Sequence, residues 1–297
     1  MAMTSNSLSY ALDEVVSGAA FDTLLESPMI GPAIFSFGPG TGYRNRVATF
    51  GTLGRFAQKT AGQEGTSGQI RQQFTRDFNH VAYSQVVTAE RELLDDDRWG
   101  ISSQIGRALG ESANYSIEKD CADVFANAFT TTLTEDALSL CNGAHLNGLG
   151  ANSQSNSGTT AISMTSVRTT REAMRRFKNY TGEEQPSSPN ALLIPPELEE
   201  DAWEIVRSTG RPDNASNAAN LYNGMFSLFV WEKLSDANNW FMLDMTKAKR
   251  QLLLKMRVSP EFFTSADQFS GNRKYGAYMR YSLGPVDWRF VYGHSVT

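Results

Sequence analysis

The feature that most constrains this chain is a polar, glycine-rich run at residues 60–68 that separates two extended segments. Its composition, Thr-Ala-Gly-Gln-Glu-Gly-Thr-Ser-Gly, favours a flexible turn. The segment after it alternates apolar and polar residues, and the phase of the alternation changes near Asn79, which predicts a strand with a bulge. We therefore predict a long hairpin over residues 47–94.

An isolated two-stranded hairpin is marginally stable in water and leaves unpaired edges, so its apolar face needs a cover. Phe74 and Phe78 share that face in the returning segment. If this chain supplies the cover, the tip is an ordinary loop. If another copy supplies it, the hairpin is an assembly device.

Charge and composition exclude several classes of protein. The 297 residues carry a formal net charge of −5, which argues against a protein that coats nucleic acid through a basic excess. No apolar run approaches the roughly 18 residues that cross a bilayer, and no Lys or Arg precedes Arg44. We expect a cytoplasmic protein whose two cysteines, Cys121 and Cys141, are reduced core residues.

The first 46 residues are predicted to form an arm. Its apolar residues, spaced as on one face of a helix, are Leu8, Leu12, Val15, Val16 and Ala19. Pro28, Pro32 and Pro39 then interrupt regular structure. For an arm with so few core features, docking on a neighbouring subunit is favoured over docking on its own chain.

The middle of the chain has a helical pattern. Apolar residues at helical spacing predict a helix of about thirty residues, in which Gly106 and Gly110 favour a bend or a close packing contact. The run Asp95 to Asp97 precedes this helix and is interpreted as a cap for its free amide groups. A short helical piece at 135–140 and a surface loop at 142–160 are expected next.

A basic helix and an acidic run follow. Ser166 is predicted to cap the basic helix, which contains Arg171 and Arg175. Its cations could contact nucleic acid phosphates or pair with acids on a neighbouring subunit. The acidic run that contains Glu199 and Glu200 offers such a partner surface.

The last third of the chain indicates a second compact unit. A buried strand is predicted at 191–194, followed by a proline turn and a short helix, and further strands are predicted at 225–231 and 240–243. Alternation at 275–281 and again at 288–292 predicts an antiparallel pair.

The sequence offers little catalytic chemistry. The cluster Asp95 to Asp97 could bind a hard cation, and with His145 it defines one alternative, a metal-dependent hydrolase. The three histidines are isolated in the sequence and no cysteine stands at ligand spacing, so neither a metal site nor a cofactor is expected. We predict a protein that is not an enzyme.

The order of these elements resembles that of the major capsid proteins of tailed bacteriophages with the Hong Kong 97-type fold. More narrowly, four segments look like the Mu-type major head subunit branch: YSQVVTAERELLDDD at 83–97, LIPPEL at 193–198, NWFMLD at 239–244 and DWRFVY at 287–292. The match spans roughly residues 81–292, whereas the arm and the hairpin agree in layout only.

The resemblance implies an α+β fold with five parts. These are an N-terminal arm at 1–46, an extended loop at 47–94 over a neighbouring subunit, a peripheral domain with a spine helix at 95–190, an axial domain at 191–244, and strands at 245–297 that return to the peripheral domain. Axial domains would meet at the centres of hexamers and pentamers. Some relatives cross-link through a loop lysine, and Lys59 lies in the loop, but no motif around it transfers that chemistry.

The implied function is a major capsid protein that forms an icosahedral virion shell around double-stranded DNA, contacted non-specifically at most. The expected partners are further copies of the chain and portal, scaffolding and decoration proteins, with assembly in the host cytoplasm and no membrane. The candidate contacts between subunits are Lys59, Gly62, Gly65, Gly68, Phe74, Phe78, Arg171, Arg175, Glu199 and Glu200. An encapsulin-type compartment, which shares the fold and encloses a cargo enzyme, is an open alternative.

Overall fold

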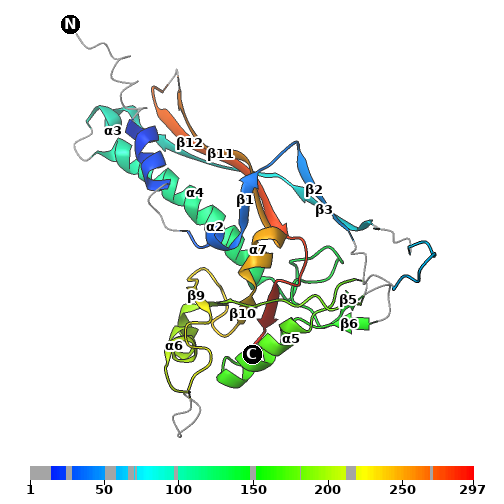
Figure 1. The fold of residues 1–297 in the computed structure, drawn as a ribbon. Helices are drawn as coiled ribbons and strands as arrows, with labels where there is room; N and C mark the ends of the chain where they lie inside the picture. The colour runs from blue at the N-terminus through cyan, green and yellow to red at the C-terminus, as the bar shows by residue number, and fades with distance from the viewer. Residues whose placement is uncertain are drawn as a thin grey trace.

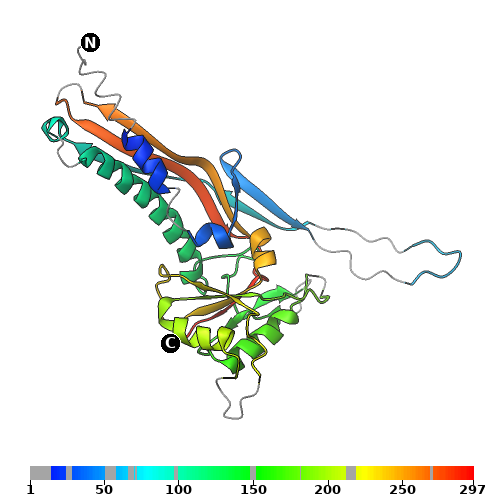
Figure 2. The same cartoon turned by 60° about the vertical axis from the view of Figure 1, so that its left-hand side comes forward.

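The computed structural model describes residues 15–24, 29–50, 58–65, 70, 72–96, 100–147, 152–180, 182–211, 219–267 and 270–297. The predictions that concern Leu8, Leu12, Gly68 and Asp97 fall outside these residues. Helices and strands build an elongated body around two main sheets, and a hairpin projects from it (Figures 1 and 2). The predicted α+β class is confirmed.

The longer sheet has the strand order β1-β11-β12-β4. β11 (Leu252–Ala266) and β12 (Arg273–Pro285) are antiparallel, and β4 (Val81–Ala89) pairs antiparallel with β12. β1 (Ser36–Pro39) runs parallel to β11. The predicted alternation in 275–281 is confirmed, since these residues are buried: Tyr275, Ala277, Met279 and Tyr281.

One long helix covers this sheet. α4 (Ile101–Ala126) has 26 residues, close to the predicted length, and runs along β12 (Figure 2). The Tyr281 hydroxyl on β12 donates to Asp120 Oδ2 on α4 at 2.7 Å, and the Tyr281 ring stacks on Tyr83 of β4 with centroids 4.7 Å apart. These contacts join the helix to two strands.

The N-terminal helix packs on α4. Residues 15–24 are helical, and Val16 and Ala20 are buried. A Cβ added at Gly106 would lie 2.3 Å from the Val16 carbonyl oxygen, and one at Gly110 would lie 2.5 Å from that of Ala20. The two glycines therefore form a close packing contact. The described part of the arm docks on its own chain, so the expectation of docking on a neighbour is wrong for these residues.

The start of α4 differs from the prediction. Its N-cap is Gly100, with a φ of 65° and no side-chain cap, and its first turn holds no acid. Glycine fits because it adopts this left-handed backbone without a Cβ penalty. Asp95 instead ends α3 (Arg91–Asp95), and Asp96 follows as the C-cap of that helix. The capping interpretation is thus wrong for both residues.

The second sheet is compact. Its order is β7-β13-β10-β8-β9, from Ser157–Gly158, Val291–His294, Trp240–Leu243, Ala191–Ile194 and Ser227–Val230. β10 is antiparallel to β13 and β8, whereas β8 is parallel to β9. Every residue of β8 and β10 is buried. The predicted strand at 191–194, its proline turn (η1, Pro196–Leu198) and the helix after it (α6, Glu199–Arg207) are confirmed.

The two sheets share one core where α4 ends. α2 (Gly31–Ile34) and α7 (Met245–Gln251) lie at this junction. Glu118 of α4 accepts hydrogen bonds from Gly31 N at 2.8 Å and from Trp231 Nε1 at 2.9 Å, and burial raises the pKa of its carboxyl group. A buried carboxylate with two donors thus holds the N-terminal segment against the second sheet.

Three local expectations fail, and one strand was missed. Residues 135–140 are a turn around Ala137, which has a φ of 61°, and not a helix. The expected surface loop at 142–160 contains β5 (His145–Asn147), β6 (Asn152–Gln154) and β7, with His145 fully buried. The segments 275–281 and 288–292 do not pair, because β12 and β13 belong to different sheets. β11 was not predicted.

Candidate assembly surfaces

The hairpin consists of β2 (Arg44–Phe50) and β3 (Gln72–Asn79), which pair antiparallel. After His80 the chain enters β4 and pairs with β12 instead. The paired strands therefore lie within 44–79, whereas the predicted hairpin covered 47–94. The phase change near Asn79 marks the passage from one sheet to another.

An ion cluster fixes the register at the base of the hairpin. Arg46 and Arg44 on β2 both contact the carboxylate of Asp77 on β3, at 2.7 and 2.8 Å. The hydrogen bond from Arg46 lowers the pKa of Asp77. Because register in a hairpin depends on such cross-strand pairs, this cluster stabilises one alignment of the two strands.

The root of the hairpin is attached to its own chain by aromatic packing. Phe78 is 5 % exposed and packs with Leu253 and Val286. Phe74 is half-buried, and its ring lies 5.3 Å from that of Tyr180. Phe78 is therefore covered by its own chain, which contradicts its prediction as a contact between subunits, and Phe74 is covered in part.

Polar groups beneath the root strengthen this attachment. Arg76 of β3 donates to the Leu133 carbonyl, and Tyr180 donates to the Glu135 carboxylate. The guanidinium of Arg289 lies 4.0 Å from the Tyr180 ring centroid and bonds to Asp287 at 2.8 Å. Burial, reinforced by the charge of Asp287, raises the pKa of Glu135. The root is thus held by polar contacts to its own chain in addition to its aromatic packing.

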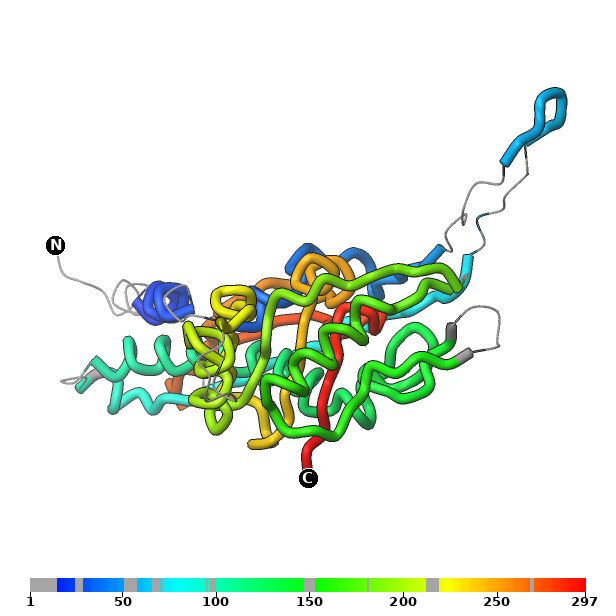
Figure 3. Tube along the Cα trace, turned by 60° about the horizontal axis from the view of Figure 1, so that its bottom comes forward, coloured from blue at the N-terminus to red at the C-terminus, as the bar shows by residue number. Residues whose placement is uncertain are grey.

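The described tip of the hairpin is open. Residues 58–65 are exposed and stand apart from the body (Figure 3). A Cβ added at Gly62 or Gly65 would meet no atom within 4 Å, and the φ of Gly62 is 86°. Lys59 is exposed, whereas Gly68 lies outside the described residues. The described tip can therefore contact another molecule without first breaking contacts with its own chain.

The basic and acidic helices flank the second sheet. α5 (Met164–Arg175) begins with a capping box in which Ser163 is the N-cap and Ser166 the reciprocal partner, which corrects the predicted cap. Arg175 is exposed and Arg171 half-buried on α5, and Glu199 and Glu200 are exposed on α6. Their role as contacts between subunits stays a prediction, and the sequence did not show on which part of the sheet each helix lies.

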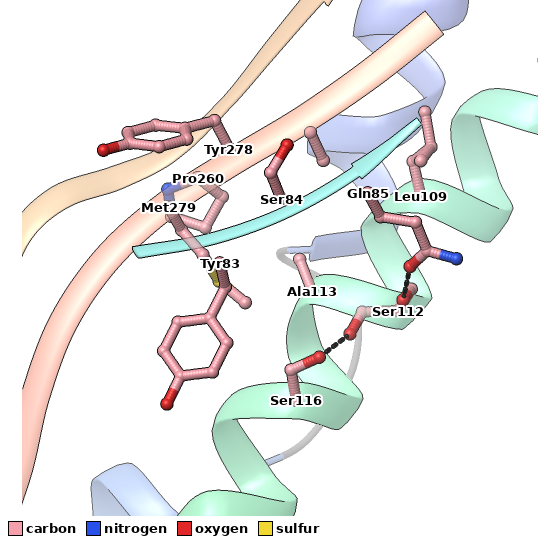
Figure 4. A pocket seen from close by; sticks show the side chains of 11 residues that line it. Tyr83, Ser84, Gln85, Leu109, Ser112, Ala113, Ser116, Pro260, Tyr278 and Met279 are labelled. Atoms are coloured by element: carbon pink, nitrogen blue, oxygen red, sulfur yellow. Dashed lines mark hydrogen bonds between the residues drawn. The ribbon is translucent and has the colours of Figure 1, made fainter. Parts of the chain in front are cut away.

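A shallow groove of about 140 Å³ lies between β4 and α4 (Figure 4). Its polar lining is engaged within the chain, since Ser112 donates to the Gln85 side chain and Ser116 donates to the Ser112 carbonyl at 2.8 Å. The outer edge of β4 exposes Val81 and Val86. This groove was not predicted, because its walls come from segments that are far apart in the sequence.

The described residues of the hydrolase alternative, Asp95, Asp96 and His145, do not come together in the fold. His145 stacks on Trp288 with centroids 4.3 Å apart, and its Nδ1 lies 2.7 Å from Asp136. Figure 1 places β5, which carries His145, and α3, which ends at Asp95, at opposite ends of the molecule. Within the described ranges, no three His, Cys, Asp or Glu side chains are grouped closely enough to bind a metal.

Both cysteines are free and buried, as predicted. Burial raises the pKa of the Cys121 thiol, which keeps it protonated. In the parts of the chain that the structure describes, no helix combines the length and the apolar character needed to cross a membrane.

Comparisons with known proteins agree with this architecture. A family model described as phage capsid protein matches residues 73–293. No curated protein matches. Among solved structures, the capsid of Cyanophage P-SCSP1u has 14 % identity and a TM-score of 0.58, covering 91 % of this chain and 88 % of that one.

Two other structures are similar at the same level. A chain from Microbacterium phage Oxtober96 has 11 % identity and a TM-score of 0.54, covering 91 % of this chain and 92 % of that one. The virus-like particle from Pyrococcus furiosus has 9 % identity and a TM-score of 0.55, covering 95 % and 98 %. Such identities show the fold alone, and the Mu-type branch stays a prediction. Because the family model matches well over half of its length, the chain belongs to the phage capsid protein family and is a major capsid protein with the Hong Kong 97-type fold.

Proposed function

We propose that this shell-forming protein assembles as hexamers and pentamers into an icosahedral shell around double-stranded DNA, with the hairpin as a strap over a neighbouring subunit. One observation carries the strap: the root is held by buried contacts of Phe78, whereas the tip at 58–65 is exposed. Because the root is fixed and the tip is exposed, the hairpin projects away from its own subunit. Its role is structural and not enzymatic.

The two sheets suggest a division of labour. We assign the long sheet with α4 to the peripheral domain and the five-stranded sheet to the axial domain, which meets its copies at capsomer centres. The expected division at 95–190, 191–244 and 245–297 is thereby modified, since β13 pairs with β10 in the five-stranded sheet. The arm at 1–46 completes the subunit.

The proposed shell indicates which partners the protein has. Further copies of the chain provide most contacts, and portal, scaffolding and decoration proteins join during assembly in the host cytoplasm. The net charge of −5 supports contacts with DNA that are few and non-specific. The family match favours this function over an encapsulin-type compartment, and neighbouring portal, terminase and tail genes would separate the two.

Cross-linking from the tip tests the strap. The two native cysteines are buried, so Lys59→Cys offers a single reactive thiol for a thiol-linked photo-cross-linker. We expect covalent dimers and higher oligomers from assembled shells and none from unassembled protein, which is the matched control. Labelled shells that yield only internal cross-links would refute the strap.

A further inference from the structure

The basic and acidic helices lie toward opposite edges of the five-stranded sheet. α5 packs on β13, next to the edge strand β7, and α6 packs on the other edge strand, β9. β10 and β8 lie between β13 and β9, so three strand spacings, or about 14 Å, separate the strands that carry the two helices.

The two helices carry opposite charges of equal size. Residues 168–178 hold four arginines and one lysine against one glutamate, a net charge of +4. Residues 197–207 hold four glutamates and one aspartate against one arginine, a net charge of −4. The exposed members are Arg168, Glu172, Arg175, Arg176, Lys178, Glu197, Glu199, Glu200, Asp201, Glu204 and Arg207. No ion pair joins these side chains within the described part of the chain.

Helix capping explains only some of these charges. Acids in the first turn of α6 and Arg175 in the last turn of α5 complement the helix dipoles. Arg168 lies in the first half of α5 and Glu204 in the second half of α6, where the dipole disfavours them. The helix dipoles therefore do not explain the charges of Arg168 and Glu204.

Exposed apolar groups accompany the acids on α6. Trp203 is 55 % exposed and Leu221 is 75 % exposed. The Asn220 side chain donates to the Ile205 carbonyl at 2.8 Å, which holds Leu221 beside α6. Aromatic side chains ringed by charge are typical of protein interfaces.

We propose that α5 of one subunit pairs with α6 of the next around each capsomer. The proposal rests on the proposed capsomers. It adds which helix of each subunit faces which helix of its neighbour in the ring. Within the described residues no ion pair joins the two helices of one molecule. Surfaces of opposite charge toward two edges of a subunit can instead meet head to tail between copies, and head-to-tail contacts close into rings. Exposed pairs set register and rate more than affinity, so the contact selects the orientation of the incoming subunit.

Charge reversal tests this pairing. The first variant carries Arg168→Glu, Arg171→Glu and Arg175→Glu, and the second carries Glu199→Lys, Glu200→Lys and Glu204→Lys. Each alone brings like charges together, so we expect the shell yield in electron micrographs to fall by about tenfold or more. The matched control combines all six substitutions, restores complementary charge, and is expected to form closed shells.

Mixing the two variants gives a sharper result. In an alternating ring, each reversed helix meets a complementary partner only if the number of subunits is even. An equimolar mixture is therefore expected to form hexamers, visible as sheets or tubes, but not pentamers or closed shells. Shells from either single variant at the wild-type yield would overturn the pairing, as would failure of both the combined variant and the mixture.

Two further outcomes would point to a different explanation. If wild-type protein forms no shells, the proposed capsomers fail before the pairing is tested. If the first variant forms shells at the wild-type yield but does not retain DNA, the basic helix contacts DNA and the pairing is overturned. Circular dichroism of each variant before assembly checks that it is folded.

Discussion

Replacing Gly106 and Gly110 by alanine is expected to release the N-terminal helix from α4. The added Cβ atoms would lie 2.3 and 2.5 Å from backbone carbonyl oxygens of residues 15–24, closer than real Cβ atoms approach. Backbone cannot rotate away as a side chain can, so the whole N-terminal helix must move outward. The change therefore acts on one contact between two helices.

The size of the effect follows from burial. Val16 is 2 % exposed and Ala20 is fully buried, and exposing them would cost about 2 to 4 kcal/mol. Each Gly→Ala change also stabilises α4 itself by about 0.5 to 1 kcal/mol, because alanine favours a helix. The combined gain of about 1 to 2 kcal/mol offsets only about half of the cost, and the two effects act on different segments.

Hydrogen exchange measured by mass spectrometry separates these effects. We expect residues 15–24 to lose protection while residues 101–126 keep or gain it. Gly18→Ala is the matched control, because a Cβ there meets no atom within 4 Å and the helix should stay docked. Unchanged protection of 15–24 in the double variant would refute the packing argument.

Three other changes test separate parts of the account. Deleting Ala61 to Gly68 should leave a monomer that is folded by circular dichroism, yet impair shell formation or maturation in electron micrographs. Normal shells from this variant would refute the role of the hairpin as a strap. Asp96→Asn should not reduce the free energy of unfolding, because an acid at a helix C-terminus is disfavoured, and a loss above about 1 kcal/mol in urea denaturation would restore the capping role. Burial lowers the pKa of His294 to about 4, so the unfolded chain binds the proton first and stability falls as pH drops from 6.5 to 4. His294→Gln should remove on the order of 3 kcal/mol of that loss in urea midpoints of unassembled protein, and an unchanged pH slope would count against the buried neutral imidazole.

Local periodicity predicted the elements whose burial is local. α4 and the strand-turn-helix at 191–207 follow from apolar spacing alone. β11 escaped prediction because it begins with the apolar run Leu252 to Leu254 and ends with exposed residues, so it lacks a clean period of two. Asp95 and Asp96 misled because acids are typical of a helix start, whereas here they stand at the end of the short helix α3, which the apolar pattern did not separate from α4.

The assembly surfaces could be predicted only in part, because they depend on contacts between segments that are distant in the sequence. The open tip could be predicted from glycine and polar composition, but Phe74 packs on Tyr180, more than one hundred residues away. Likewise, the charges of α5 and α6 are visible in the sequence, whereas their placement toward opposite edges depends on sheet order. Such order arises from contacts between distant segments, which a single sequence does not display.

The most direct test of the central claim is a cryo-electron microscopy reconstruction of the assembled protein. We expect a closed shell with rings of six and five subunits, in which residues 58–65 of each hairpin lie against a neighbouring subunit. A particle that stays near 32.8 kDa under all assembly conditions would contradict the account, as would a shell in which every hairpin folds back onto its own chain.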